Sequence, residues 1–319
     1  MTFKKVAPCF QLTVTSVSTF LKKANMTRYK LSVFLILTGI CAIFTSPASV
    51  AGAPPQISGA EYFYGQDSNG IQVMCVIQKP HPNGDGVSFK AWNGMTVPIT
   101  VLFKPKLENL KADANFPMLL IIPAGSTKAA YSARVVNHSQ PHTWENNWTW
   151  RIGTINASHD KSILYARPFP KTSNFKIVQG YNGRGSHQGE FTHSIDWDMP
   201  IGTPVLAARP GTVGFIRDAF SGHSTDPSWK ERTNTVTIYH DDGTMAEYSH
   251  IKQHSARVKV GDRVETAGII ALSADVGYAV SPHLHFRVFR NRETPHGIVE
   301  ESLPVLFKGP DGKPEALGR

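Results

Sequence analysis

Beyond residue 52, the apolar residues of this chain occur in short runs that are separated by clusters of proline, glycine and asparagine. Runs of this length between turn-forming residues are typical of β-strands. The sustained 3.6-residue period of an amphipathic helix does not appear. We therefore predict a mainly β protein, with strands that include the runs at 71–77, 97–103, 118–122, 204–208, 211–216, 235–239, 258–264 and 269–272.

The same pattern predicts two domains. We expect residues 52–170 to form an N-terminal β-sandwich-like accessory domain, because its strands are short and closely spaced. Three tryptophans of this region are expected to pack in the core rather than to form a sugar-binding patch: Trp144, Trp148 and Trp150. A proline-containing linker follows, and residues 171–300 are expected to form a second β domain.

Two segments depart from the strand rhythm of the second domain. Residues 218–232 carry no regular apolar pattern, so we predict an insertion loop that borders a substrate groove. Residues 301–319 are rich in proline, glycine and lysine, and we expect a poorly ordered tail.

The first fifty residues have the composition of an export signal. Basic residues precede the apolar run 31–44, small residues follow it, and no acidic residue occurs before Glu61. The run is shorter than the roughly 20 residues that span a bilayer. We therefore predict that residues 1–51 are a cleaved leader, with Met26 as an alternative start. The mature protein is then exported to the periplasm or cell envelope, or secreted, without a stable membrane anchor; an uncleaved anchor is the alternative.

Removal of this leader changes the charge of the protein. The leader holds six basic residues and no acidic one, so the formal net charge falls from +9 to +3. No basic stripe with interleaved aromatic residues is present, and we expect no nucleic-acid partner. Only Cys75 remains of the three cysteines, which excludes an intramolecular disulfide and a thiolate metal cluster in the mature chain.

Candidate chemistry is concentrated in the second domain. The segment 281–289 has the alternating pattern of a strand, so His283 and His285 share one face while Leu284 points to the other. A catalytic zinc ion takes three ligands from the protein and leaves its fourth position to water. Imidazole and carboxylate groups suit it, and the upstream candidates are His187, Asp196 and His250.

Residues 178–289 resemble the M23 family of zinc metallopeptidases, the lysostaphin and LytM type that cuts peptidoglycan peptides. The resemblance implies an antiparallel β-sheet LytM-type catalytic domain with one zinc ion per chain. It implies that Asp196 and His285 are zinc ligands and that His250 and His283 are the catalytic pair. The matching segments, in the order of the family, are 179–187, 195–205, 207–213, 234–240, 248–250, 260–264 and 282–286.

The third zinc ligand departs from the family motif, which places a histidine four residues before the aspartate, where this chain has Thr192. His193 is three residues before Asp196, so on a continuous strand it would face away from the metal. His187 is nine residues before Asp196 and resembles the Ser-His that follows a glycine-rich turn in one branch of the family. We favour His187 and keep His193 as the alternative.

Two further features of the site are left open by the sequence. Asp198 shares a strand face with Asp196 and is either a partner of the ligands or a solvated residue. Asp275 and Val276 stand in a turn where relatives usually carry a Ser-Gly-Asn-Thr-Gly-like sequence, which changes the lining near the site.

The resemblance and the predicted export together imply a function. We expect a zinc-dependent endopeptidase that hydrolyses peptide cross-links of peptidoglycan, with the peptide stems as its partner; in a Gram-negative envelope this would be a D,D-endopeptidase. The alternative is a catalytically inactive M23-like regulator that binds the cell wall or activates an amidase. All five family positions are filled if His187 is the third ligand, which favours the enzyme.

Overall fold

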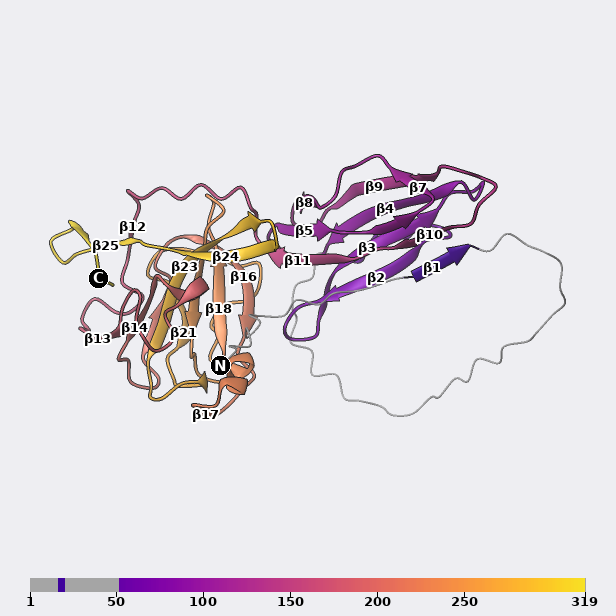
Figure 1. Ribbon diagram of the computed structural model, residues 1–319. Helices are drawn as coiled ribbons and strands as arrows, with labels where there is room; N and C mark the ends of the chain where they lie inside the picture. Colours follow the sequence, from indigo (N-terminus) through magenta and orange to yellow (C-terminus); the bar gives the residue numbers. More distant parts are fainter. Residues whose placement is uncertain (1–16, 21–51, 319) are drawn as a thin grey trace, which may run out of the picture.

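The computed structural model describes residues 17–20 and 52–318 (Figure 1). The predicted leader therefore lies outside the described residues, apart from strand β1 (Val17–Phe20). The described residues form β-strands and two short 3₁₀ helices, η1 (Gly189–Phe191) and η2 (Pro227–Arg232), so the prediction of a mainly β protein is confirmed. Neither helix has the length or apolar content needed to cross a membrane.

The N-terminal part is built from three antiparallel sheets, and strands of all three contribute to its main hydrophobic cluster. A five-stranded sheet has the order β2-β3-β4-β9-β7, and three-stranded sheets have the orders β11-β5-β8 and β1-β10-β6 (Figure 1). The strands are β2 (Glu61–Gln66), β3 (Gln72–Pro80), β4 (Gly86–Asn93), β5 (Ile99–Phe103), β6 (Lys106–Glu108), β7 (Leu110–Ala112), β8 (Met118–Ile122), β9 (Thr127–Val135), β10 (His142–Glu145) and β11 (Trp148–Ile152).

The tryptophans of this part lie in its core, as predicted. Trp144 and Trp148 are each 2% exposed, and Trp150 packs against the same cluster. The indole Nε1 of Trp144 donates a hydrogen bond to Gln78 Oε1 at 3.0 Å, which satisfies the only polar atom of that side chain. Burial of a large apolar side chain contributes about 1.5–3 kcal/mol to folding, so Trp144 and Trp148 stabilise the sheets, while Trp150 is partly buried at the edge of the cluster.

The C-terminal part is organised around an antiparallel sheet with the order β13-β14-β23-β19-β18-β16-β20, in which β24 also pairs with β23. Smaller pairings join β15 to β21, β17 to β22, β12 to β25, and β25 to β26. The strands are β12 (Leu164–Tyr165), β13 (Ile177–Gln179), β14 (Ser194–Trp197), β15 (Pro204–Leu206), β16 (Gly211–Arg217), β17 (His223–Ser224), β18 (Thr235–Tyr239), β19 (Met245–Ser249), β20 (Arg263–Val264), β21 (Ile269–Leu272), β22 (Gly277–Tyr278), β23 (Leu284–Thr294), β24 (Gly297–Leu303), β25 (Leu306–Lys308) and β26 (Pro314–Glu315).

Three local predictions differ from the structure. The strand expected at 258–264 is reduced to the two residues of β20, because residues 258–262 form a loop and turn. The tail after residue 300 was expected to be poorly ordered, but it contains the end of β24 and the paired strands β25 and β26, and the carbonyl of Gly318 accepts a hydrogen bond from Tyr181 N at 2.6 Å. The predicted strand 281–289 begins only at Leu284. His283 precedes it, forms an isolated β-bridge with Ala274, and has its ring Nδ1 2.7 Å from the carbonyl oxygen of Ser281.

The two parts of the chain contact each other directly. Asn291, near the end of β23, donates a hydrogen bond from Nδ2 to the carbonyl of Ile152 at 2.6 Å. Gly153 lies so close to Met245 that a Cβ at this glycine would be 2.7 Å from the methionine methyl group. The contact therefore involves the distal half of the strand that carries His285 at its other end.

Candidate metal centre

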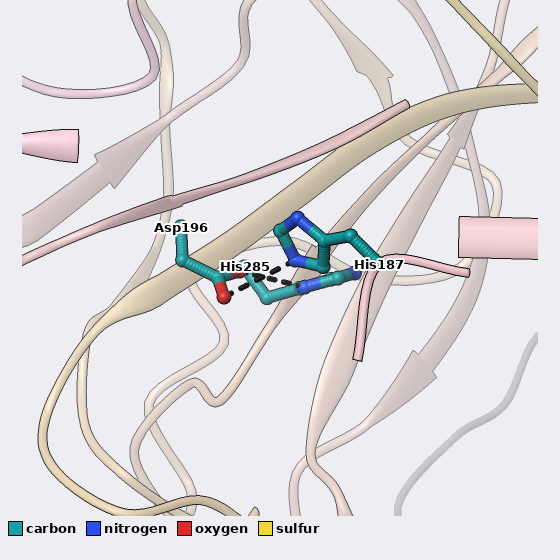
Figure 2. Close-up of side chains that lie close together, drawn as sticks. All are labelled: His187, Asp196 and His285. Carbon is teal, nitrogen blue, oxygen red and sulfur yellow. Dashed lines mark hydrogen bonds and ion pairs between the residues drawn. The ribbon is translucent and has the colours of Figure 1, made fainter. Parts of the chain in front are cut away.

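Three candidate ligands come together in the C-terminal domain: His187, Asp196 and His285. One donor atom from each lies within 4.8 Å of the other two, and all three residues are buried (Figure 2). Asp196 belongs to β14 and His285 to β23, whereas His187 lies in the loop before η1. Residues that are far apart in the chain thus converge on one point.

The sheet fixes two of these side chains. In the antiparallel pairing of β14 with β23, Asp196 stands directly opposite His285. Directly opposite residues on one face have neighbouring side chains. The imidazole Nδ1 of His285 is 2.8 Å from Asp196 Oδ1, while its Nε2 is buried without a hydrogen-bond partner among the described residues.

The third side chain is oriented by the backbone. His187 Nδ1 is 2.7 Å from the carbonyl oxygen of Gly180, and a carbonyl can only accept, so Nδ1 carries the proton. The opposite nitrogen, Nε2, then presents a lone pair. It lies 3.1 Å from Asp196 Oδ2, is buried, and makes no hydrogen bond within the described part of the chain.

This arrangement fits a zinc ion. Nitrogen and oxygen ligands lie about 2.0–2.2 Å from zinc, which places tetrahedral donor atoms about 3.3 Å apart. His187 Nε2 is 3.1 Å from Asp196 Oδ2 and His285 Nδ1 is 2.8 Å from Asp196 Oδ1, so each imidazole nitrogen is near that distance from one carboxylate oxygen. The buried lone pair on His187 Nε2 also favours a bound cation. A buried polar atom without a hydrogen-bond partner destabilises the fold, and coordination to a cation would remove this cost.

The electrostatics of the site favour a charged carboxylate. Burial alone would raise the pKa of Asp196, but the charge of His285 and the contacts with both imidazoles outweigh it and hold the pKa well below its usual range. Asp196 is therefore ionised at neutral pH. A carboxylate and two imidazoles form the ligand set that catalytic zinc sites use.

His250 and His283 stand beside this group as a pair. Their ring centroids are 4.3 Å apart, and the ring of His250 is 6.2 Å from that of His285. Each ring is oriented through Nδ1, which donates to the carbonyl of Val276 at 3.0 Å in His250 and to the carbonyl of Ser281 in His283. Both Nε2 atoms therefore carry a free lone pair.

Both rings of the pair are neutral at pH 7. Burial, followed by the charges of His283 and His285, lowers the pKa of His250 to about 3. Burial also lowers the pKa of His283, although the charge of Asp196 opposes this shift. His250 has a φ of 66°, a left-handed conformation that is rare for a residue other than glycine and is often found at functional sites.

The remaining candidates lie outside the metal group. His193 turns towards β24, where its Nδ1 is 2.8 Å from the carbonyl of Ser302, and Asp198 is exposed. Asp275 Oδ2 lies 3.0 Å from Nδ1 of His223 in the predicted insertion loop, and Val276 contributes its carbonyl to His250. The unusual turn therefore links that loop to the candidate catalytic pair.

A buried charged network lies next to the site. Arg287 Nη2 bonds Glu247 at 2.9 Å and Glu300 at 2.6 Å, and Nη1 bonds the carbonyl of Glu190 at 3.3 Å. The guanidinium also lies 4.4 Å from the ring centre of Phe191. These contacts attach the loop that follows His187 to strand β23.

Glu190 is expected to make stability depend on pH. Burial and the charges of Glu300 and Glu247 raise its pKa to about 7, despite the opposing charge of Arg287. The folded state therefore holds a proton that the unfolded state loses above about pH 4.5, so the ionised carboxylate destabilises the fold as pH rises through 7. We expect Glu190→Gln to raise Tm by a few degrees at pH 8 and to leave it nearly unchanged at pH 4.

Differential scanning fluorimetry at the two pH values tests this expectation. Glu265→Gln is a suitable control, because Glu265 is an exposed carboxylate of the same domain. A Glu190→Gln protein with a lower Tm than wild type at pH 8 would show that the charged carboxylate stabilises the fold instead.

Comparisons with known proteins agree with the geometry. The sequence profile of Peptidase family M23 matches residues 190–296. The chain is 35% identical over 134 residues to a protein of Buchnera aphidicola subsp. Baizongia pistaciae named uncharacterized metalloprotease, which covers 39% of this chain and 31% of that protein. It is 29% identical over 159 residues to lysostaphin of Staphylococcus simulans, which covers 49% of this chain and 29% of lysostaphin.

A further relative is the peptidoglycan DD-endopeptidase ShyA of Vibrio cholerae, 28% identical over 147 residues, with coverage of 44% of this chain and 31% of ShyA. The chain thus spans less than a third of the length of each of these relatives. The segment that matches the family profile, residues 190–296, contains Asp196, His250, His283 and His285. Residues 190–296 of the C-terminal part are therefore a domain of peptidase family M23.

Proposed function

We propose that the protein is a zinc-dependent endopeptidase that hydrolyses peptide cross-links of peptidoglycan. The single observation that carries the proposal is the buried group of His187, Asp196 and His285, with two neutral histidines beside it. Lysostaphin and a peptidoglycan DD-endopeptidase among the relatives support the substrate class. We further propose that each chain holds one zinc ion and that the protein acts in the cell envelope after removal of residues 1–51.

The proposed mechanism divides the work between ligands and bases. His187 Nε2, one carboxylate oxygen of Asp196 and His285 Nδ1 would hold the ion, and His285 must release the Nδ1 proton to do so. When bound, zinc lowers the pKa of a water molecule to about 7 and polarises the carbonyl of the scissile peptide.

His250 and His283 would move the protons. A neutral imidazole with a free Nε2 lone pair accepts a proton from the attacking water, and the backbone carbonyl at its Nδ1 stabilises the cation that results. The other imidazole, once protonated at Nε2, donates to the developing oxyanion. Either histidine can take either role with the hydrogen bonds observed.

Zinc content and hydrolysis, measured on the same sample, test the proposed function. We expect about one zinc per purified chain and release of soluble muropeptides from purified sacculi. A chelator should abolish the release and added zinc should restore it. A protein that binds sacculi but contains no zinc and releases nothing would instead be a regulator built on a peptidase fold.

A further inference from the structure

Asp196 has a second cross-strand neighbour, Gln179, on the side of β14 opposite to His285. Strand β13 pairs with β14 through an irregular register, in which Ile177 stands opposite Trp197 and Gln179 stands opposite Asp196. A regular ladder would place Val178 opposite Asp196. One extra residue in a strand is a β-bulge, which re-aims side chains near functional sites. Here the bulge exchanges an apolar neighbour of the aspartate for a hydrogen-bonding amide.

The side-chain amide of Gln179 joins Asp196 to the loop of His187. Its Nε2 donates to Asp196 Oδ2 at 3.2 Å and to Ser186 Oγ at 2.8 Å. Its Oε1 accepts from the backbone N–H of Gly185 at 3.2 Å. Both atoms of one amide are thus used, and the partners Gly185 and Ser186 directly precede His187.

Asp196 has room for these contacts and a metal ion together. Its Oδ1 faces His285, and its Oδ2 faces both His187 and Gln179. A carboxylate offers about four lone-pair positions, so a bond from Gln179 occupies one and leaves others for a cation. The bond restricts rotation of the carboxylate towards solvent.

Two glycines of the loop make space for this amide. A Cβ at Gly185 would lie 2.6 Å from Gln179 Oε1, and a Cβ at Gly183 would collide with Gln179 Cγ. Neither glycine has a positive φ, so the requirement is space rather than backbone conformation. The glycine-rich turn therefore serves the side chain of Gln179.

We propose that Gln179 is a positioning residue, which holds the carboxylate of Asp196 and the His187 loop in the geometry that binds zinc. The inference rests on the proposed zinc site. Gln179 precedes residues 190–296, the segment that matches the family, so that match does not assign it a role. The contacts of Gln179 fix the position of His187, which lies nine residues before Asp196 on a separate loop and is not held by the strand that carries Asp196.

Zinc affinity of the purified protein, measured by competition with a chromogenic chelator, tests the inference. Gln179→Met keeps the length of the side chain and removes its hydrogen bonds. We expect affinity to fall about 10–100-fold, the usual effect of removing a partner that orients a metal ligand. Without zinc, Tm should change little.

Gln188→Met is a matched control. Gln188 belongs to the same loop, and its amide bonds the carbonyls of Asn182 and Gly183 at 3.3 Å and 3.1 Å, but it does not bond Asp196. We expect this variant to keep wild-type zinc affinity. An equal loss in both variants would mean that the loop needs packing only, which overturns the role of Gln179.

Gly183→Ala provides a second approach that keeps the amide but displaces it. We expect a loss of affinity comparable to that of Gln179→Met, and the double variant Gly183→Ala/Gln179→Met should lose less than the product of the two single losses, because both act on one contact. Wild-type protein that binds zinc with the same affinity as Gln179→Met overturns the inference alone. Wild-type protein that binds no zinc overturns it together with the proposed metal site.

Discussion

Substitution of His187 by alanine is expected to remove zinc from the protein and to lower the rate of hydrolysis by a factor on the order of 10³ or more. The site offers three candidate ligands, and His187 Nε2 is a buried nitrogen with no hydrogen-bond partner among the described residues. Metal catalysis supplies several kcal/mol of transition-state stabilisation, and each 1.36 kcal/mol is about tenfold in rate. Zinc content by mass spectrometry and muropeptide release on the same sample measure both effects.

The matched variant is His193→Ala. His193 is closer to Asp196 in the chain, but its ring bonds Ser302 O and packs against Tyr181, 5.2 Å between ring centres. We expect His193→Ala to keep its zinc and most of its activity. Zinc that is lost from His193→Ala and retained in His187→Ala would reverse the ligand assignment.

Substitution of His250 or His283 by alanine is expected to separate catalysis from metal binding. Neither ring belongs to the group of three, and both are held by carbonyls rather than by Asp196. Loss of a general acid or base typically lowers rate by about 10²–10⁴-fold. We therefore expect each variant to release muropeptides at that reduced rate while it retains about one zinc per chain.

His254→Ala is the control for these two variants, since His254 is exposed and has no place in the site. Its activity should equal that of wild type. Zinc loss in His283→Ala that matches the loss in His285→Ala would contradict the division of roles, because it would make His283 a ligand.

Most strands of this fold can be predicted from the sequence, because their apolar residues form short runs between turn-forming residues. The order in which these strands pair cannot be read from the same pattern. Asp196, His285, His283 and His250 could be named because a family motif carries them. The position of His187 is harder to predict, because a loop rather than a strand brings this residue to the site. The path of a loop is not encoded in a periodic pattern of apolar residues.

The contacts that orient the site could not be predicted from the sequence. Backbone carbonyls at Gly180 and Val276 fix two imidazoles, and every residue has a carbonyl, so no side chain signals this role. The role of Gln179 could not be predicted, because only the bulge in β13 places this residue opposite Asp196. The glycines of the turn are visible in the sequence as a feature of the family motif. Their structural role, which is to leave space for the side-chain amide of Gln179, is visible only in the structure.

The contact between the two parts of the chain has a practical consequence. A fragment that begins at residue 171 would leave the amide of Asn291 without its acceptor on Ile152 and would expose Met245, which is now 1% exposed. Newly exposed apolar surface promotes aggregation. Recombinant work on the peptidase domain should therefore retain the segment around 152–157, or replace Met245 with a polar residue, before poor solubility is taken as a property of the domain itself.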